Sequence, residues 1–284
     1  MKKALSNVLT ALVYLILFAP MVVLVVFSFN GSKSLSVFTE PSMRWYQELL
    51  RDRNTLQTLR NTLLLALSAT VISGVMGTAA AWGIDRLRSR WYRSVITMVT
   101  DLPMTSPDII TGISLMLMFV FAGRFFGCRN SLNFWTMLLA HVTFCLPYVI
   151  LQVLPRLRQM DTALPEAAMD LGCTAWQAFW KVEMPEMLPG IVTGVIMAFT
   201  MSLDDFVISY FTAGTDFQTL PIHIYSMTKK TVTPKMYALA SIIFAVTLAL
   251  LLVSNAVSER DEENRHSRRP HRVRRRAGGE GSMD

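Results

Sequence analysis

The sequence predicts an all-α integral membrane protein with six transmembrane helices. Hydrophobic residues make up 52% of the chain and charged residues only 17%, whereas soluble proteins carry about 25% charged residues. The charges gather between long uncharged stretches, as loops do between membrane spans. Apolar residues cover nearly every face of these stretches, so they are neither half-buried soluble helices nor the alternating strands of a membrane barrel.

The first two spans are uncharged throughout. The first is expected at about 8–29, within a charge-free run over 4–32. That run is longer than the ~7–15-residue core of a cleaved signal peptide, and no A-x-A site follows, so we expect the span to be retained. The second span, 61–84, carries Ser73, Gly77 and Ala81 at every fourth position. Small residues at this spacing predict a closely packed neighbouring helix.

The third span is expected over about 95–121, as a single helix interrupted by charges and prolines. Asp101 and Asp108 lie within it, together with Pro103 and Pro107. Each proline removes a backbone donor from the helix. Such freed backbone groups are tolerated at membrane depth where the chain lines a cavity. We therefore expect a kinked helix beside a cavity.

The last three spans are expected at 132–154, 188–213 and 236–257. His141 lies inside the first of them, where a hydrogen-bonded packing role is favoured over a role in proton transfer. Three scattered cysteines, Cys128, Cys145 and Cys173, suit neither a disulfide framework nor a zinc site. No metal site is expected.

The arginines of one short loop predict how the chain is oriented in the membrane. The short loop after the second span carries four of them in about ten residues, Arg86, Arg88, Arg90 and Arg93. Short cytoplasmic loops are enriched in such residues. This loop, the loop 155–187 and both termini are therefore expected in the cytoplasm. The basic tail 258–284 is expected to be disordered, and we assign the chain's positive charge to membrane flanks rather than to nucleic acid.

Two loops carry further helical signals. In the outside loop, 43–50 predicts a short interfacial helix with aromatic anchors. In the cytoplasmic loop, Asp161 is expected to cap a first helix that Gly172 ends. Thr174 and Gln177 form the pattern of a capping box for a second helix, and Pro185 is expected to block its continuation.

The cytoplasmic loop also predicts two apolar faces. Leu164, Ala168 and Leu171 would line one helix, and the second would carry three aromatic residues, Trp176, Phe179 and Trp180. So much apolar surface requires a partner or lipid to cover it.

This loop resembles the EAA signature, E-A-A-x3-G-x9-I-x-L-P. Glu166, Ala167, Ala168, Gly172 and Pro185 match it in identity and spacing, and Val and Met replace its Ile and Leu. The signature belongs to permease subunits of type I ABC importers. The resemblance implies a MetI-like permease fold with a coupling loop at about 158–186. It also implies that Glu166 contacts a cytoplasmic ATPase and that the glycine provides the turn.

The chain is not expected to be an enzyme. It contains no G-x-x-x-x-G-K-[ST] loop to hold phosphates. We therefore expect no catalytic residue and no cofactor in this chain, with ATP and Mg bound by a separate ATPase subunit.

Acidic residues at membrane depth are candidates for a translocation pathway. Asp108 and Asp204 are expected at comparable depths, beyond the middle of the bilayer, and negative charge suits a cationic cargo. Asp204 and Asp205 point about 100° apart on a helix, so at most one faces a pore. The alternative is that these acids cap broken helices or pair with basic residues, namely Arg124, Lys229 or Lys230.

Four further segments resemble spermidine/putrescine permeases, most closely the second permease subunit. They are 105–110, 141–147, 199–205 and 220–227. This resemblance implies a bacterial inner-membrane protein that pairs with a different permease, an ATPase dimer and a soluble binding protein. Two alternatives remain. One is a type I permease for a metal cation, thiamine or an amino acid, and the other is an ion-coupled secondary transporter.

The expected organisation has three parts. Residues 1–59 form the first span and an outside loop, 60–257 the permease core, and 258–284 the tail.

Overall fold

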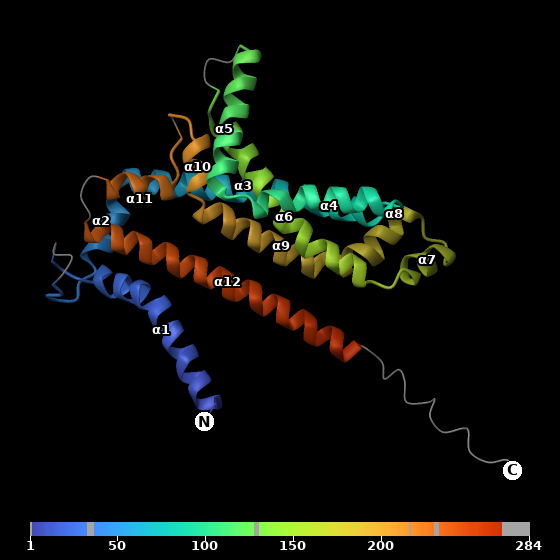
Figure 1. Ribbon diagram of the computed structural model, residues 1–284, viewed down its shortest axis with the longest axis horizontal. Helices are drawn as coiled ribbons and strands as arrows, with labels where there is room; N and C mark the ends of the chain where they lie inside the picture. The colour runs from blue at the N-terminus through green and yellow to red at the C-terminus, as the bar shows by residue number, and fades with distance from the viewer. Residues whose placement is uncertain (1, 33–36, 128–130, 216, 230–232, 269–284) are drawn as a thin grey trace.

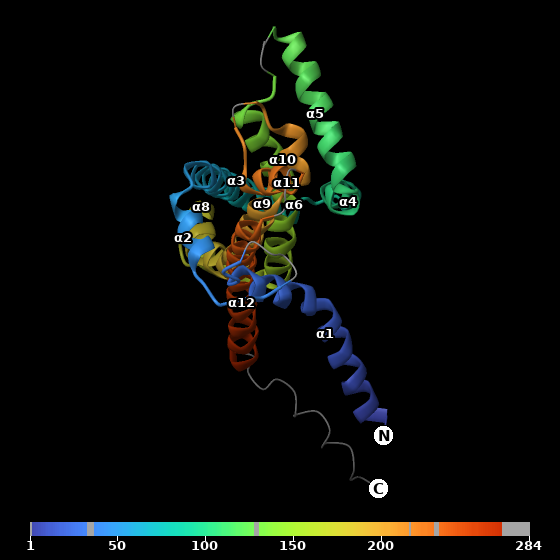
Figure 2. The same ribbon diagram turned by 90° about the vertical axis from the view of Figure 1, so that its left-hand side faces the viewer.

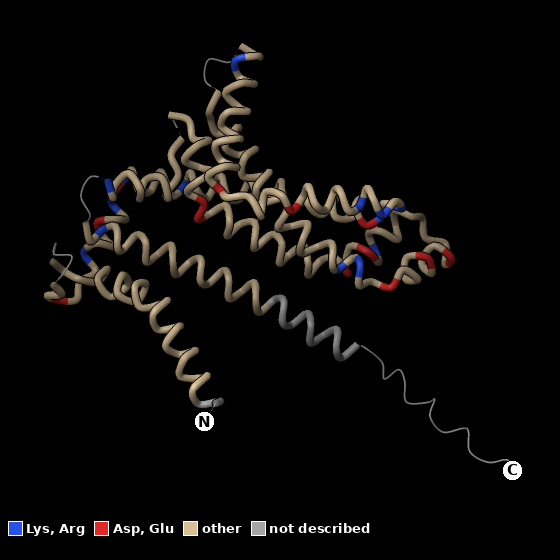
Figure 3. The backbone as a smooth tube through the Cα atoms, viewed as in Figure 1, with Lys and Arg blue, Asp and Glu red and all other residues tan. Residues whose placement is uncertain are grey.

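The computed structural model describes residues 2–32, 37–127, 131–215, 217–229 and 233–268, and these residues form helices without a regular strand. Within them, six helical segments are long and apolar enough to cross a membrane, which confirms the predicted fold class. The helices that contain them are α1 (Lys2–Ser28), α3 (Arg53–Asp85), α5 (Asp108–Phe125), α6 (Phe134–Gln159), α9 (Met184–Asp204) and α12 (Pro234–Arg268). Figure 3 shows charged residues gathered mainly at the two ends of the bundle.

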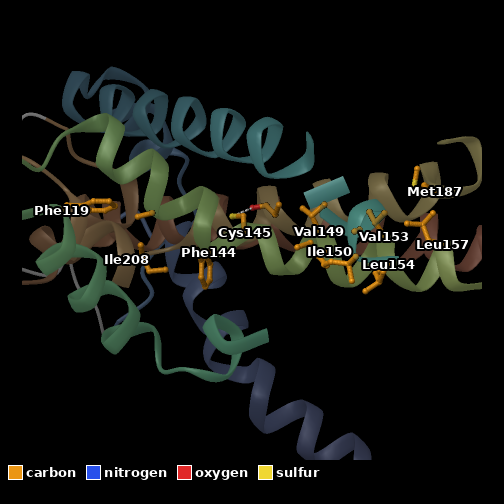
Figure 4. Close-up of a cluster of buried hydrophobic side chains, with 14 residues drawn as sticks. Phe119, Phe144, Cys145, Val149, Ile150, Val153, Leu154, Leu157, Met187 and Ile208 are labelled. Carbon is orange, nitrogen blue, oxygen red and sulfur yellow. Dashed lines mark hydrogen bonds between the residues drawn. The ribbon is translucent and has the colours of Figure 1, made fainter. Parts of the chain in front are cut away.

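Helices α3, α6 and α9 form the centre of the molecule and pack against one another (Figure 1). The small residues of α3 make this possible. A Cβ atom on Gly77 would lie 2.7 Å from the Cβ of Val149 on α6, and Ser73 and Ala81 are fully buried. The predicted close approach is thereby confirmed. The apolar core follows α6 (Figure 4), with Val149 and Val153 wholly inaccessible.

The third span is two helices rather than one. Helix α4 (Arg90–Thr105) ends before Ser106, whose backbone is extended, and α5 begins at Asp108. The residue before a proline is driven out of the helical region, so Pro107 breaks the segment completely. Pro103 lies inside α4. Helix α5 turns steeply away from α4 (Figure 1), and only α5 has the length and composition of a span.

The fifth span is interrupted as well. Helix α9 ends at Asp204, Asp205 has extended backbone angles, and the short α10 (Val207–Thr212) follows. Helix α10 packs against α5 and α6. Both interruptions of the bundle therefore lie beside acidic residues.

Helix α2 (Arg44–Arg51) forms as predicted, but its tryptophan is buried and does not anchor it to a membrane surface. Trp45 is 4% exposed, and its Nε1 donates to the Asn30 carbonyl at 2.6 Å. It packs with Leu220 from α11 (Leu220–Thr228) and Leu239 from α12. The ring is an internal packing residue, because these distant segments enclose it.

The two terminal helices lie at the margin of the bundle. Side chains of α1 are largely exposed, and α1 leads away from the other helices in Figure 2. Helix α12 continues to Arg268 and so includes 258–268, the beginning of the predicted tail. The remainder of the tail, 269–284, together with Cys128 and Lys230, lies outside the described residues.

Candidate functional site

The loop at 158–186, predicted from its signature to be the coupling loop, forms the expected helix, turn and helix. Helix α7 (Ala163–Asp170) begins after Asp161, whose Oδ1 accepts from the Ala163 amide at 3.0 Å. Gly172 has φ +92°, a conformation that glycine adopts without strain. The predicted capping box starts α8 (Ala175–Ala178), with reciprocal bonds between Thr174 and Gln177 of 3.0 and 3.3 Å.

The first helix of this loop exposes the residues that match the signature. Glu166 and Ala167 are exposed, and Ala168 is half-buried. Leu171 is 88% exposed and Leu164 47%. An acid surrounded by uncovered apolar side chains has the composition of a protein contact surface.

The prediction that Pro185 ends the second helix is wrong. Helix α8 passes through a π-helical turn (Phe179–Glu183) into α9, and Pro185 is the second residue of α9. Proline has no amide to donate, and the π-helical turn directly before it already departs from the regular α-helical hydrogen-bond pattern. The loop therefore joins α9 through continuous helix.

A buried acid joins this segment to α3, and the sequence analysis missed it. Glu183 is 3% exposed. Its carboxylate accepts from Trp82 Nε1 at 2.6 Å and forms a short ion pair with Arg86. The Arg86 guanidinium lies 4.5 Å from the centre of the Trp82 ring. The sequence did contain a signal for this residue. Glu183 is an acid at a variable (x) position of the signature, directly before a predicted membrane span.

The aromatic residues of the second helix border an apolar cavity of about 630 Å³. Phe179 packs edge-on against Trp82 with ring centres 5.2 Å apart, so α3 covers part of the predicted apolar face. Trp176 and Trp180 remain 68% and 50% exposed. Side chains of α3 and α9 form the other walls.

Of the two adjacent acids, Asp205 caps a helix. Its carboxylate accepts from the Ser209 amide at 2.7 Å and the Ile208 amide at 3.3 Å, both in the first turn of α10. Its side chain is 6% exposed, and Oδ2 lies 3.5 Å from His141 Nε2. This is the capping role that the sequence left open, and neither Arg124 nor Lys229 contributes to it.

His141 has the packing environment favoured by the sequence analysis. It is 1% exposed. Its Nδ1 lies 2.8 Å from the Ser202 hydroxyl and its Nε2 3.0 Å from the Ser209 hydroxyl. These contacts tie α6 to α9 and α10, and they fix the imidazole between two serines.

The remaining predicted acids lie at the ends of the interrupted helices. Asp204 is the last residue of α9, Asp108 is the first of α5, and both are exposed. The helices that follow these acids, α5 and α10, both contact α6. Both interruptions therefore lie beside α6. No group of three metal-ligating side chains occurs among the residues that the structure describes.

Residues 73–261 match the model of a protein family described as "Binding-protein-dependent transport system inner membrane component". The chain belongs to this family. It is therefore a multi-pass protein of the inner membrane and the membrane component of a transport system.

Two relatives align with this chain over nearly its full length. The chain is 38% identical to the "Putrescine transport system permease protein PotI" of Escherichia coli K12, over 92% of this chain and 95% of that protein. It is 35% identical to the "Spermidine/putrescine transport system permease protein PotC" of Haemophilus influenzae, over 90% and 97%.

Two solved ABC transporter structures share the fold. A bacterial ABC transporter involved in the import of alginate aligns with a TM-score of 0.67 at 18% identity, covering 90% of this chain and 95% of that one. An amino acid ABC transporter aligns with a TM-score of 0.54 at 21% identity, covering 77% and 96%. At these identities, the comparison establishes the fold alone.

Proposed function

We propose that this inner membrane component is a permease subunit of an ATP-driven importer that carries polyamines. The observation that supports it most is the 38% identity with a putrescine permease over 92% of the chain. Acids at two helix interruptions, which suit a cationic cargo, add to it. Both termini and the coupling loop lie in the cytoplasm in this proposal.

The proposed assembly contains four kinds of component. A second, different permease subunit pairs with this chain, an ATPase dimer binds ATP and Mg inside, and a soluble binding protein delivers cargo outside. This chain binds no cofactor itself. Membrane lipid surrounds its spans, and its sequence divides into the three parts 1–59, 60–257 and 258–284.

Two groups of residues carry the function in this proposal. Glu166, Ala167, Ala168, Gly172 and Pro185 belong to the loop that docks on the ATPase. Asp108 and Asp204 attract the cargo within the pathway, and Asp205 holds the adjoining α10 in register through its two backbone contacts.

The docking role is tested with the complete importer in proteoliposomes. Glu166→Ala is expected to weaken co-purification of the ATPase and to lower ATP-dependent uptake of radiolabelled putrescine by about tenfold, as for loss of one charged interface contact. Glu48→Ala removes an exposed acid from α2 and serves as the control. Wild-type uptake and binding in the Glu166 variant would refute the docking role.

The cargo is tested in the same vesicles. Asp108→Asn and Asp204→Asn are each expected to reduce putrescine uptake while the complex still assembles. Uptake must require ATP and the partner subunits. Uptake by this chain alone, driven by a proton gradient, would contradict the proposed class of transporter.

A further inference from the structure

A second cavity, of about 650 Å³ and lined by both polar and apolar side chains, lies along α4, away from Asp108. It is lined by one face of α4 and by the end of α6, as follows: Arg90, Arg93, Ser94, Thr97, Met98, Asp101, Leu102, Thr105 and Arg158. The proposed function assigns no role to this cavity. Asp101 is the only carboxylate among these residues.

One carboxylate oxygen of Asp101 has no hydrogen-bond donor among the described residues that line this cavity. Its Oδ1 is buried and accepts no hydrogen bond from any residue that the structure describes. A buried carboxylate oxygen without a partner is costly. Such a group in a cavity wall is available to accept a hydrogen bond from a donor that enters the cavity.

The neighbouring hydroxyls add acceptors of the same kind. Thr97 donates its proton to the Arg93 carbonyl at 2.9 Å, and Thr105 donates to the Leu102 carbonyl at 3.1 Å. Both oxygens therefore retain only accepting lone pairs toward a ligand. Thr97, Asp101 and Thr105 are spaced by four residues, so they form a row about 12 Å long on one face of α4.

Apolar side chains lie beside this row. Met98 is 72% exposed and Leu102 54% exposed, and both line the cavity. A ligand that alternates ammonium groups with methylene segments would meet acceptors on the row and apolar surface beside it. A compact metal ion would gain nothing from the apolar part.

Arginines occur toward the coupling-loop end of the cavity and do not neutralise Asp101. Arg93 Nη2 donates to the carbonyls of Asp85 at 2.6 Å and Leu87 at 2.9 Å, and its Nε is buried without a partner in the described part of the chain, two helical turns before Asp101. Arg90 and Arg158 are exposed. No ion pair joins Asp101 to an arginine among the described residues.

We propose that the Asp101 cavity is a second binding station for an aliphatic cation with two or more ammonium groups, on the coupling-loop side of Asp108. The inference rests on the proposed transport of polyamines and extends it. One ammonium group binds Asp101, the threonine oxygens accept from it or from the next group, and the methylene chain packs on Met98 and Leu102. Cargo that leaves Asp108 is thereby held once more before release.

The test uses the complete importer in proteoliposomes with radiolabelled putrescine. Asp101→Asn removes the charge at constant size, and Asp101→Glu keeps the charge. The control is Thr100→Val, one position earlier, outside the residues that line the cavity. Putrescine transported per ATP hydrolysed is the deciding readout, because a merely structural defect lowers transport and hydrolysis together. Co-purification of the partner subunits monitors assembly.

We expect the ratio of putrescine to ATP to fall about tenfold in Asp101→Asn, the order expected for loss of one charged hydrogen bond. Asp101→Glu and Thr100→Val should keep the ratio within about twofold. If Asp101→Asn keeps the wild-type ratio of putrescine transported to ATP hydrolysed, the proposed binding station is refuted. Loss of assembly in both Asp101 variants would also overturn it, because the acid would then bind a partner subunit. If the wild-type importer carries no putrescine, both the station and the proposed function fail.

Discussion

Arg86→Ala is the most informative single change at the junction of the coupling loop with α3. The Glu183 side chain is 4% exposed, and its carboxylate has two donors, Trp82 Nε1 and Arg86 Nη2. Removing one partner of a buried ion pair costs about 3–5 kcal/mol, because the remaining charge stays buried. The Arg86 side chain is 51% exposed, so water reaches the pair and screens it.

The expected loss of stability is therefore smaller than for a fully buried pair. We reduce the ion-pair contribution to about 1–2 kcal/mol for screening. Arg86 also lies over the Trp82 ring, which adds about 0.5–1 kcal/mol. The sum is about 2 kcal/mol, which corresponds to a decrease in Tm of about 4–8 °C for a chain of this size.

Thermal unfolding of the purified protein in detergent measures this decrease. Arg88→Ala, an exposed arginine two residues further on, is the matched control and should change Tm little. Glu183→Gln should cost less than Arg86→Ala, because the amide oxygen still accepts from Trp82 and no buried charge remains. Equal Tm values for the Arg86 and Arg88 variants would refute the assigned contribution of the junction.

Three further predictions concern stability. Gly77→Ala should lower the free energy of unfolding by about 1–3 kcal/mol through overpacking against α6. Gly83→Ala is the control and should stabilise α3, because there is open space around Gly83. Equal effects of the two substitutions would contradict the close packing of Gly77 against α6. Gly172→Ala should lower the free energy of unfolding by about 1 kcal/mol, because φ at this position is +92°. An unchanged Tm would contradict the positive-φ turn at Gly172. A hydrogen bond from Lys235 lowers the pKa of Asp52 from 3.8 to about 2. The pair therefore stabilises the fold above about pH 4, and this is lost as pH falls through about 2. Asp52→Asn should cost about 1 kcal/mol at pH 7, after allowance for screening, and nothing below pH 2; a pH-independent difference in unfolding would oppose this assignment.

Much of the fold could be predicted because membrane spans are determined by local composition. Long uncharged runs located the spans, and the small residues at 73, 77 and 81 indicated a closely packed neighbour. Local hydrogen bonds were equally readable, as in the capping box of Thr174 and Gln177 and the glycine turn at 172. Each of these features depends on residues within a few positions of one another.

The breaks in the third and fifth spans needed the tertiary structure. Prolines and acids marked both places, but a kinked helix and two separate helices have the same local composition. The structure gives two helices at each, with Asp205 capping α10 and Asp108 opening α5. The capped helix α10 is held by packing against α5 and α6, which no local pattern encodes.

The sequence by itself determined that this chain crosses a membrane six times and carries a helical loop with an EAA-type signature. Only the tertiary structure decided which polar residues have partners. Glu183 meets Trp82 across 101 positions, and Asp101 faces a cavity with one oxygen unsatisfied. The physical reason is that hydrophobicity and helix capping act over one or two turns. Burial and ion pairing depend instead on which distant segments the fold brings into contact.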